Sequence, residues 1–111
     1  MTVAQLAEVF SAQIKDVSEE ACNRLVADVY LCDLLSWVIG RAQKDSAWIT
    51  IMSNQNVAAV ALLAEVSCVL LAEGVQPDDS LITKAREQDI PVLSIDLPAY
   101  EIAKKLAALG V

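Results

Sequence analysis

Residues 47–74 read AWITIMSNQNVAAVALLAEVSCVLLAEG, and this stretch decides the fold. AWITIM (47–52) and SCVLLAE (67–73) are short and contain the continuously apolar runs ITIM and VLLA, as strands do when helices cover both faces of a sheet. Between them, SNQN (53–56) is typical of a loop and NVAAVALLAEV (56–66) of a helix. A strand, a helix and a second strand in this order predict parallel strands joined by a crossover.

The same alternation extends in both directions from this unit. Runs rich in branched and apolar residues predict four strands, at residues 25–32, 47–52, 67–73 and 91–96. Amphipathic or apolar segments predict the helices that follow each strand, at residues 33–41, 56–66, 81–89 and 98–109. The helix caps that we expect are Asp33, Asn54 or Asn56, and Asp79 or Ser80.

Residues 1–28 read as a lead-in to this core of βα units, which occupies residues 29–111 of one 111-residue domain. Thr2 and Gln5 have the spacing of a capping box for a first helix. SAQIKDV (11–17) predicts a short strand, and residues 18–21 a polar connection. The sequence therefore predicts a three-layer α/β fold: a mostly parallel sheet of four or five strands with helices on both faces.

The charge and the reactive side chains exclude several classes of function. Fifteen acidic and eight basic residues give a net charge of −7, which disfavours nucleic acid and anionic membrane surfaces as partners. There is no histidine, and the three scattered cysteines, two of them inside apolar runs, suit small buried hydrophobes better than a zinc site. We expect no metal and no cofactor.

The location of the protein is inferred from the same residues. The N-terminus lacks the basic region of a signal peptide. The uncharged stretch 47–64 approaches the length of a membrane span, but four polar residues interrupt it at 53–56. We therefore expect a cytoplasmic protein.

An excess of apolar residues predicts an interface between copies of the chain. Hydrophobic residues make up 56% of the sequence, and the mean hydropathy is +0.47, which a domain of this size would struggle to bury alone. Two helices are apolar nearly all round and must be covered on more than one side, by core or by a partner. Their candidate interface residues are Leu34, Leu35, Trp37 and Val38 in the first, and Ala59, Leu62 and Leu63 in the second.

A candidate ligand site lies where the strands end. In open parallel sheets, ligands bind outside the carboxyl ends of the strands, and helix N-termini there can hold anions. The residues at these ends are Ser53, Asn54, Gln55 and Asn56 in one loop and Glu73 and Gly74 in the next. The alternative is structural: the asparagines cap a helix, and the glycine supplies a positive φ for a turn.

Asp33 and Asp96 also follow strands and could be read as paired carboxylates for acid–base chemistry. Each is also well placed to cap a helix, and we favour this structural explanation. No serine, cysteine or lysine stands in a recognisable nucleophile motif, and no P-loop or GxGxxG motif is present. We therefore expect the protein not to be an enzyme.

The segments VYLCDLLSWVIGRA (29–42), 47–74 and AREQDIPVLSIDLPAYEIAKKLAALG (85–110) together resemble the DRTGG domain family. Larger relatives carry a glycine-aspartate-arginine loop where this chain has Ser53, Asn54 and Gln55, and paired glycines where it has Glu73 and Gly74. The chain is therefore similar to the short, stand-alone members of the family.

The resemblance implies a fold shared with the N-terminal domain of HPr kinase/phosphorylase and a regulatory or dimerising role. The module lies beside CBS domains in some pyrophosphatases, and short relatives are often encoded near iron-only hydrogenase subunits.

The first interpretation is thus a regulatory or ligand-sensing homodimer that binds a nucleotide or small anion at the strand ends. The alternative is an accessory protein that assembles on a partner protein in a larger redox complex, such as an iron-only hydrogenase, without a small ligand.

Overall fold

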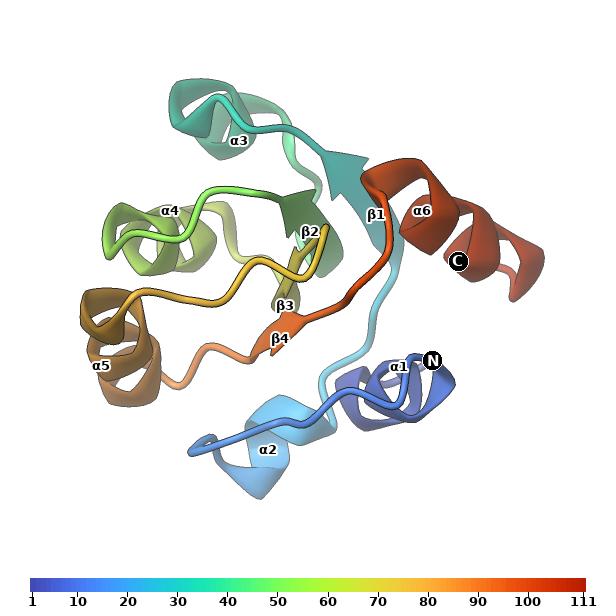
Figure 1. Ribbon diagram of the computed structural model, residues 1–111, viewed down its shortest axis with the longest axis horizontal. Helices are drawn as coiled ribbons and strands as arrows, with labels where there is room; N and C mark the ends of the chain where they lie inside the picture. Colours follow the sequence, from blue (N-terminus) through green and yellow to red (C-terminus); the bar gives the residue numbers. More distant parts are fainter.

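The computed structural model describes residues 1–111 as one sheet flanked by helices (Figure 1). The strands are β1 (Asp28–Leu31), β2 (Ser46–Thr50), β3 (Cys68–Leu71) and β4 (Val92–Ser94). The helices are α1 (Val3–Val9), α2 (Glu19–Cys22), α3 (Leu35–Arg41), α4 (Asn56–Ala64), α5 (Asp79–Gln88) and α6 (Ala99–Ala108). Each predicted strand and helix of the core is present. Most are shorter than predicted, whereas β2 and α5 begin one and two residues earlier.

All four strands are parallel, and their order in the sheet is their order in the chain, β1-β2-β3-β4. The central strand β2 is buried along its whole length, because helices cover both of its faces. The predicted α/β fold with a parallel sheet is confirmed, and the sheet has four strands.

The helices form two layers, one on each face of the sheet (Figure 1). The crossover helices α3, α4 and α5 lie side by side on one face, and α1 and α6 lie on the other. Alternate residues of β2 serve the two cores: Trp48 packs under the crossover helices, whereas Ala47 and Ile49 face α1 and α6. The uncharged stretch 47–64 is divided between β2, a loop and α4, and no helix is both long and apolar enough to span a membrane.

The lead-in differs from the prediction at two points. Residues 11–17 form no strand, because no ladder of hydrogen bonds joins them to the sheet and the backbone turns through positive φ angles at Ser11 (50°) and Asp16 (58°). Residues 18–21 are not only a connection: Ser18 caps the short helix α2 by accepting a hydrogen bond from the amide of Ala21. The predicted capping box of Thr2 and Gln5 is confirmed.

The three predicted helix caps of the core are wrong. The N-caps of α3 and α4 are Leu34 and Gln55, and Asp79 and Ser80 lie inside α5. Asp33 does not cap α3; its Oδ1 accepts hydrogen bonds from Thr50 Oγ1 (2.7 Å) and from the amide of Ile51 (2.9 Å). The N-cap of α5 is Asp78, and its carboxylate accepts a hydrogen bond from Ser53 Oγ instead of from the helix.

Candidate functional site

The loop Ser53–Asn56 is held closed by hydrogen bonds within the protein. Ser53 Oγ donates to Asp78 Oδ1 (3.0 Å), and the Ser53 carbonyl accepts from the Asp78 amide (2.9 Å). Asn54 Oδ1 accepts from the amide of Asn56 (2.9 Å) and so stabilises the start of α4. The hydroxyl of Ser53 and the side-chain oxygen of Asn54 are therefore already engaged.

Only the second half of this loop borders an open space. Gln55 and Asn56 line a shallow cavity of about 230 Å³ between the N-terminal end of α4 and the side of α5. The remaining lining residues are Ala59, Lys84 and Gln88. Gln88 Oε1 is buried there without a hydrogen-bond partner.

Glu73 and Gly74 form a tight turn after β3. Gly74 has φ +69°, as expected from the sequence, and Glu73 adopts the same left-handed region at φ +61°. Their amides donate to the carbonyls of Leu97 and Ile95, and a Cβ on Gly74 would lie 3.0 Å from Asp96 Oδ1. These two residues hold the β4–α6 connection against the end of β3, and they do not line the cavity beside Gln55 and Asn56.

The strand order explains why the rim is shallow. A crevice opens at the end of a parallel sheet where the strand order reverses and successive helices go to opposite faces. Here the order has no reversal, and α3, α4 and α5 all lie on the same face. Neighbouring loops therefore pack on each other, as Ser53 and Asp78 do.

The two carboxylates that could be read as a pair, Asp33 and Asp96, have different local contacts. Asp33 is engaged with Thr50 and Ile51, and Asp96 lies beside Gly74. Burial raises the pKa of the Cys68 thiol to about 12, so this sulfur stays protonated and unreactive at neutral pH. No group of three or more histidine, cysteine or acidic side chains could hold a metal ion.

The outer surface of α3 and α4 is apolar and exposed. Leu34, Trp37, Leu62 and Leu63 keep 48–67% of their surface exposed, and Ala59 of α4 is also exposed, where it lines the cavity shared with α5. The guanidinium of Arg41 lies 3.6 Å from the centre of the Trp37 ring. We call Leu34, Trp37, Ala59, Leu62 and Leu63 the α3–α4 face.

Two of the predicted interface residues lie inward. Val38 is completely buried in the core between the sheet and helices α3, α4 and α5. It has no exposed surface to contact a partner, so its assignment to an interface is wrong. Leu35 is half-buried and packs on the same core. A helix that is apolar all round does not show from its sequence which side meets the sheet.

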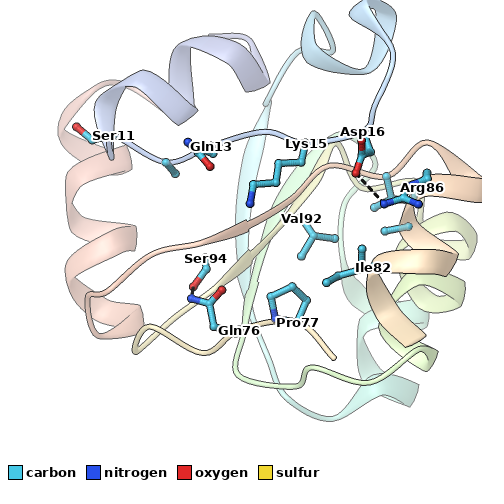
Figure 2. A pocket seen from close by; sticks show the side chains of 13 residues that line it. Ser11, Gln13, Lys15, Asp16, Gln76, Pro77, Ile82, Arg86, Val92 and Ser94 are labelled. Carbon is cyan, nitrogen blue, oxygen red and sulfur yellow. Dashed lines mark hydrogen bonds and ion pairs between the residues drawn. The ribbon is translucent and has the colours of Figure 1, made fainter. Parts of the chain in front are cut away.

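A second cavity, larger than the one beside Gln55 and Asn56, lies elsewhere and was not predicted. It has a volume of about 350 Å³ and lies between the segment Ser11–Asp16, the edge strand β4 and helix α5 (Figure 2). Lys15, Gln76 and Ser94 contribute polar groups to it, and Asp16 and Arg86 form an ion pair at one end (2.9 Å). We call this cavity the β4 cleft. Its walls come from three separate segments of the chain, so no local motif could have indicated it.

Comparison with known proteins agrees with this architecture. The DRTGG domain family matches residues 5–109, and no curated protein matches the chain. Among solved structures, the CBS and DRTGG domains of the regulatory region of the Clostridium perfringens pyrophosphatase, complexed with the activator diadenosine tetraphosphate, align with a TM-score of 0.75 at 14% identity. The alignment covers 93% of this chain and 44% of that one, so the chain spans less than half of the regulatory region. From the match over residues 5–109, the chain belongs to the DRTGG domain family.

Proposed function

We propose that this chain is a non-catalytic regulatory domain that acts as a homodimer through the α3–α4 face. The observation that carries the proposal is the exposure of large apolar side chains, above all Trp37 and Leu63, on two neighbouring helices. Contiguous apolar surface on a soluble domain marks a binding surface, and Trp is enriched at the centres of interfaces.

The charge distribution supports a second copy of the chain as the occupant. The protein carries a net charge of −7, so two copies repel each other over most of their surfaces. Helix α4 (Asn56–Ala64) contains no charged residue, and α3 (Leu35–Arg41) contains only Arg41. The α3–α4 face itself therefore contains no acidic side chain, and the acidic residues nearest to it in the chain are Asp33 before α3 and Glu65 after α4.

The regulatory part of the proposal is supported by the family. The solved relative is the regulatory region of a pyrophosphatase, and its activator is a nucleotide. For this chain, a nucleotide or a small anion at the strand ends would bind in the small cavity beside Gln55 and Asn56, which Lys84 also lines while its ammonium pairs with Glu87 (3.5 Å). The engaged side chains of Ser53 and Asn54 leave these two residues a structural role.

A second candidate function is assembly on another protein, such as a subunit of a larger redox complex. The closed Ser53–Asp78 loop beside an exposed apolar face favours this alternative, because it offers a partner surface and little room for a ligand. The three free cysteines suit a reducing compartment, and we propose the cytoplasm for either function.

The test is the mass of the protein in solution. Sedimentation equilibrium at 1–200 μM protein should give twice the mass of the 11.9 kDa chain at the upper end of this range. Leu63→Glu should give a monomer, because it places a carboxylate in each half of the interface. Leu109→Glu is the matched control, since Leu109 is 52% exposed on the opposite layer, and this variant should remain dimeric.

A monomeric wild-type chain at 200 μM would refute the homodimer and leave the face to a different partner. Monomers from both variants would also count against the α3–α4 face, because the effect would then not depend on the position of the added charge.

A further inference from the structure

We propose that the β4 cleft binds a small organic anion with a planar, hydrogen-bonding ring, of the kind found in a nucleoside monophosphate. This site is distinct from the strand ends and from the α3–α4 face. The inference rests on the proposed regulatory role, since it names a class of signal, but it does not depend on the dimer.

The size and the apolar lining of the cleft fit a small molecule. Its volume of about 350 Å³ falls within the range of roughly 300–1,000 Å³ that is usual for ligand pockets. Pro77, Ile82 and Val92 form an apolar side, and Ile82 keeps 39% of its surface exposed there. In Figure 2 Ile82 lies beside α5, and Val92 and Pro77 lie between it and Ser94; the side chain of Lys15 runs from the Ser11–Asp16 segment in the direction away from α5. A flat ring would cover this apolar surface with little loss of entropy.

The edge of the sheet supplies unpaired backbone groups to the cleft. On its inner side β4 bonds to β3 through alternate residues: the Pro91 carbonyl accepts from the amide of Val69, and the Ile95 amide donates to the carbonyl of Leu71. The amides and carbonyls of Val92 and Ser94 therefore point away from β3, and both residues line the cleft. No backbone hydrogen bond joins them to the neighbouring lead-in segment.

The unpaired amides and carbonyls of Val92 and Ser94 lie in a row along the strand. Such a row can bond to a ring that carries hydrogen-bond donors and acceptors on one edge. Backbone groups away from bulk water require a partner, which a heteroaromatic ring can provide. The side chain of Gln76 adds to this wall: its Nε2 donates to Ser94 Oγ (3.1 Å), and Ser94 Oγ donates to the Val75 carbonyl (2.7 Å). These two bonds fix the amide of Gln76 at one end of the cleft (Figure 2).

The charge of the cleft selects an anion. Arg86 is neutralised by its ion pair with Asp16, and Asp16 is the only acidic residue of the lining. Lys15 makes no ion pair, so the cleft carries one free positive charge in a protein whose net charge is −7. A phosphate or carboxylate on the ligand would pair with Lys15 Nζ.

The same open edge could accept an extended peptide as an added strand, but the observations favour the smaller ligand. Strand β4 spans only Val92–Ser94, so an added strand would pair with two outward-facing residues. The Ser11–Asp16 segment also forms a wall along this edge, which closes the cleft to a long chain (Figure 2).

The experiment is a titration of the ¹⁵N-labelled protein followed by amide chemical shifts. Three probes separate the parts of the ligand: adenosine monophosphate has the ring and the anion, adenosine has the ring alone, and inorganic phosphate has the anion alone. Adenosine monophosphate should shift the amides of Lys15, Gln76, Val92 and Ser94. The other two probes should shift the same amides with at least tenfold weaker affinity.

Lys15→Gln should weaken the binding of adenosine monophosphate about tenfold, since it removes one charge-assisted contact. Lys44→Gln is the matched control, since Lys44 is an exposed lysine that lines neither cavity, and it should leave this binding unchanged. Both variants should keep the mass of the wild-type protein in solution, so a failure of this site is distinguishable from a failure of the dimer.

Shifts centred on Gln55 and Asn56 would overturn the inference in favour of the strand ends. An absence of shifts with millimolar adenosine monophosphate would overturn it as well. The inference would also be overturned if an extended peptide protected the Val92 and Ser94 amides from hydrogen exchange while the nucleotide had no effect.

Discussion

Replacing Asp33 by alanine should lower the free energy of unfolding by roughly 2 kcal/mol. One oxygen of this carboxylate accepts hydrogen bonds from Thr50 Oγ1 and from the amide of Ile51, at the end of the neighbouring strand. Thr50 is 2% exposed, so its hydroxyl loses an acceptor without gaining water in return. Hydrogen bonds to a charged group contribute about 1.5–3 kcal/mol each, and exposure of Asp33 and Ile51 reduces the value here.

For a chain of 111 residues, a loss of this size corresponds to a fall in Tm of roughly 8 °C. Urea denaturation followed by tryptophan fluorescence is a suitable assay, because Trp48 lies in the core next to this contact and donates its indole N–H to the Cys32 carbonyl (2.8 Å). Asp33→Asn keeps an acceptor oxygen and should lose only part of the stability.

A double-mutant cycle tests the assigned partner. Thr50→Val should cost about 1 kcal/mol in the wild-type protein and much less in the Asp33→Ala protein, because the hydroxyl then has no carboxylate to bond. If Asp33→Ala costs less than about 0.5 kcal/mol, or if Thr50→Val costs the same in both backgrounds, the argument from this hydrogen bond is refuted.

Two further predictions concern Asp89 and Gly74. Hydrogen bonds from the side chain and the amide of Ser18, together with the ion pair to Arg24, lower the pKa of Asp89. The contribution of Asp89 to stability is therefore complete above the unfolded-state pKa of about 4, and it is lost as the pH falls through the folded-state pKa. Asp89→Asn should therefore be less stable than the wild type at pH 7, and the difference between their urea midpoints should shrink toward pH 3; a constant difference would contradict this. Gly74→Ala should cost about 1–2 kcal/mol by thermal denaturation, because φ is +69° and the new Cβ would lie 3.0 Å from Asp96 Oδ1. Gly40→Ala is the control within a helix, where nothing lies within 4 Å, and it should be neutral or stabilising; equal losses from both substitutions would contradict the assignment.

The core of the fold could be predicted from the sequence because each of its elements has a strong local signal. The apolar runs around Trp48 and Leu70 form strands that are buried on both faces, and the segments between them are long enough to be crossover helices. Thr2 and Gln5 bond to each other over three residues, so their spacing alone indicates the capping box.

The lead-in could not be predicted in the same way. Ala12 and Ile14 face the core while Gln13 and Lys15 face outward, which is the period of a strand. Whether an extended segment joins a sheet depends on the position of the edge strand, and β4 is about 80 residues away in the sequence. The segment therefore has a strand pattern without strand pairing.

The candidate functional surfaces also differ in how far the sequence could predict them. The exposure of Trp37 and Leu63 agrees with the prediction that their helices have more apolar surface than the core can cover. Packing between distant segments determines which side of α3 faces the core, and so buries Val38. It also determines that Asp33 bonds to Thr50. The β4 cleft is a product of tertiary structure alone, because its residues lie between Ser11 and Ser94 in the chain.

The sequential strand order has a consequence for how the protein folds. Residues that pair in the sheet are only roughly twenty positions apart, so each βα unit can add to the previous one with a short loop to close. The lead-in, by contrast, is held to α5 and its C-terminal end by contacts that span 65–71 residues, through Asp16, Ser18 and Arg24. We expect it to dock after the sheet has formed, so the β4 cleft is completed in the last folding step, and a ligand bound there would stabilise the segment that is easiest to release.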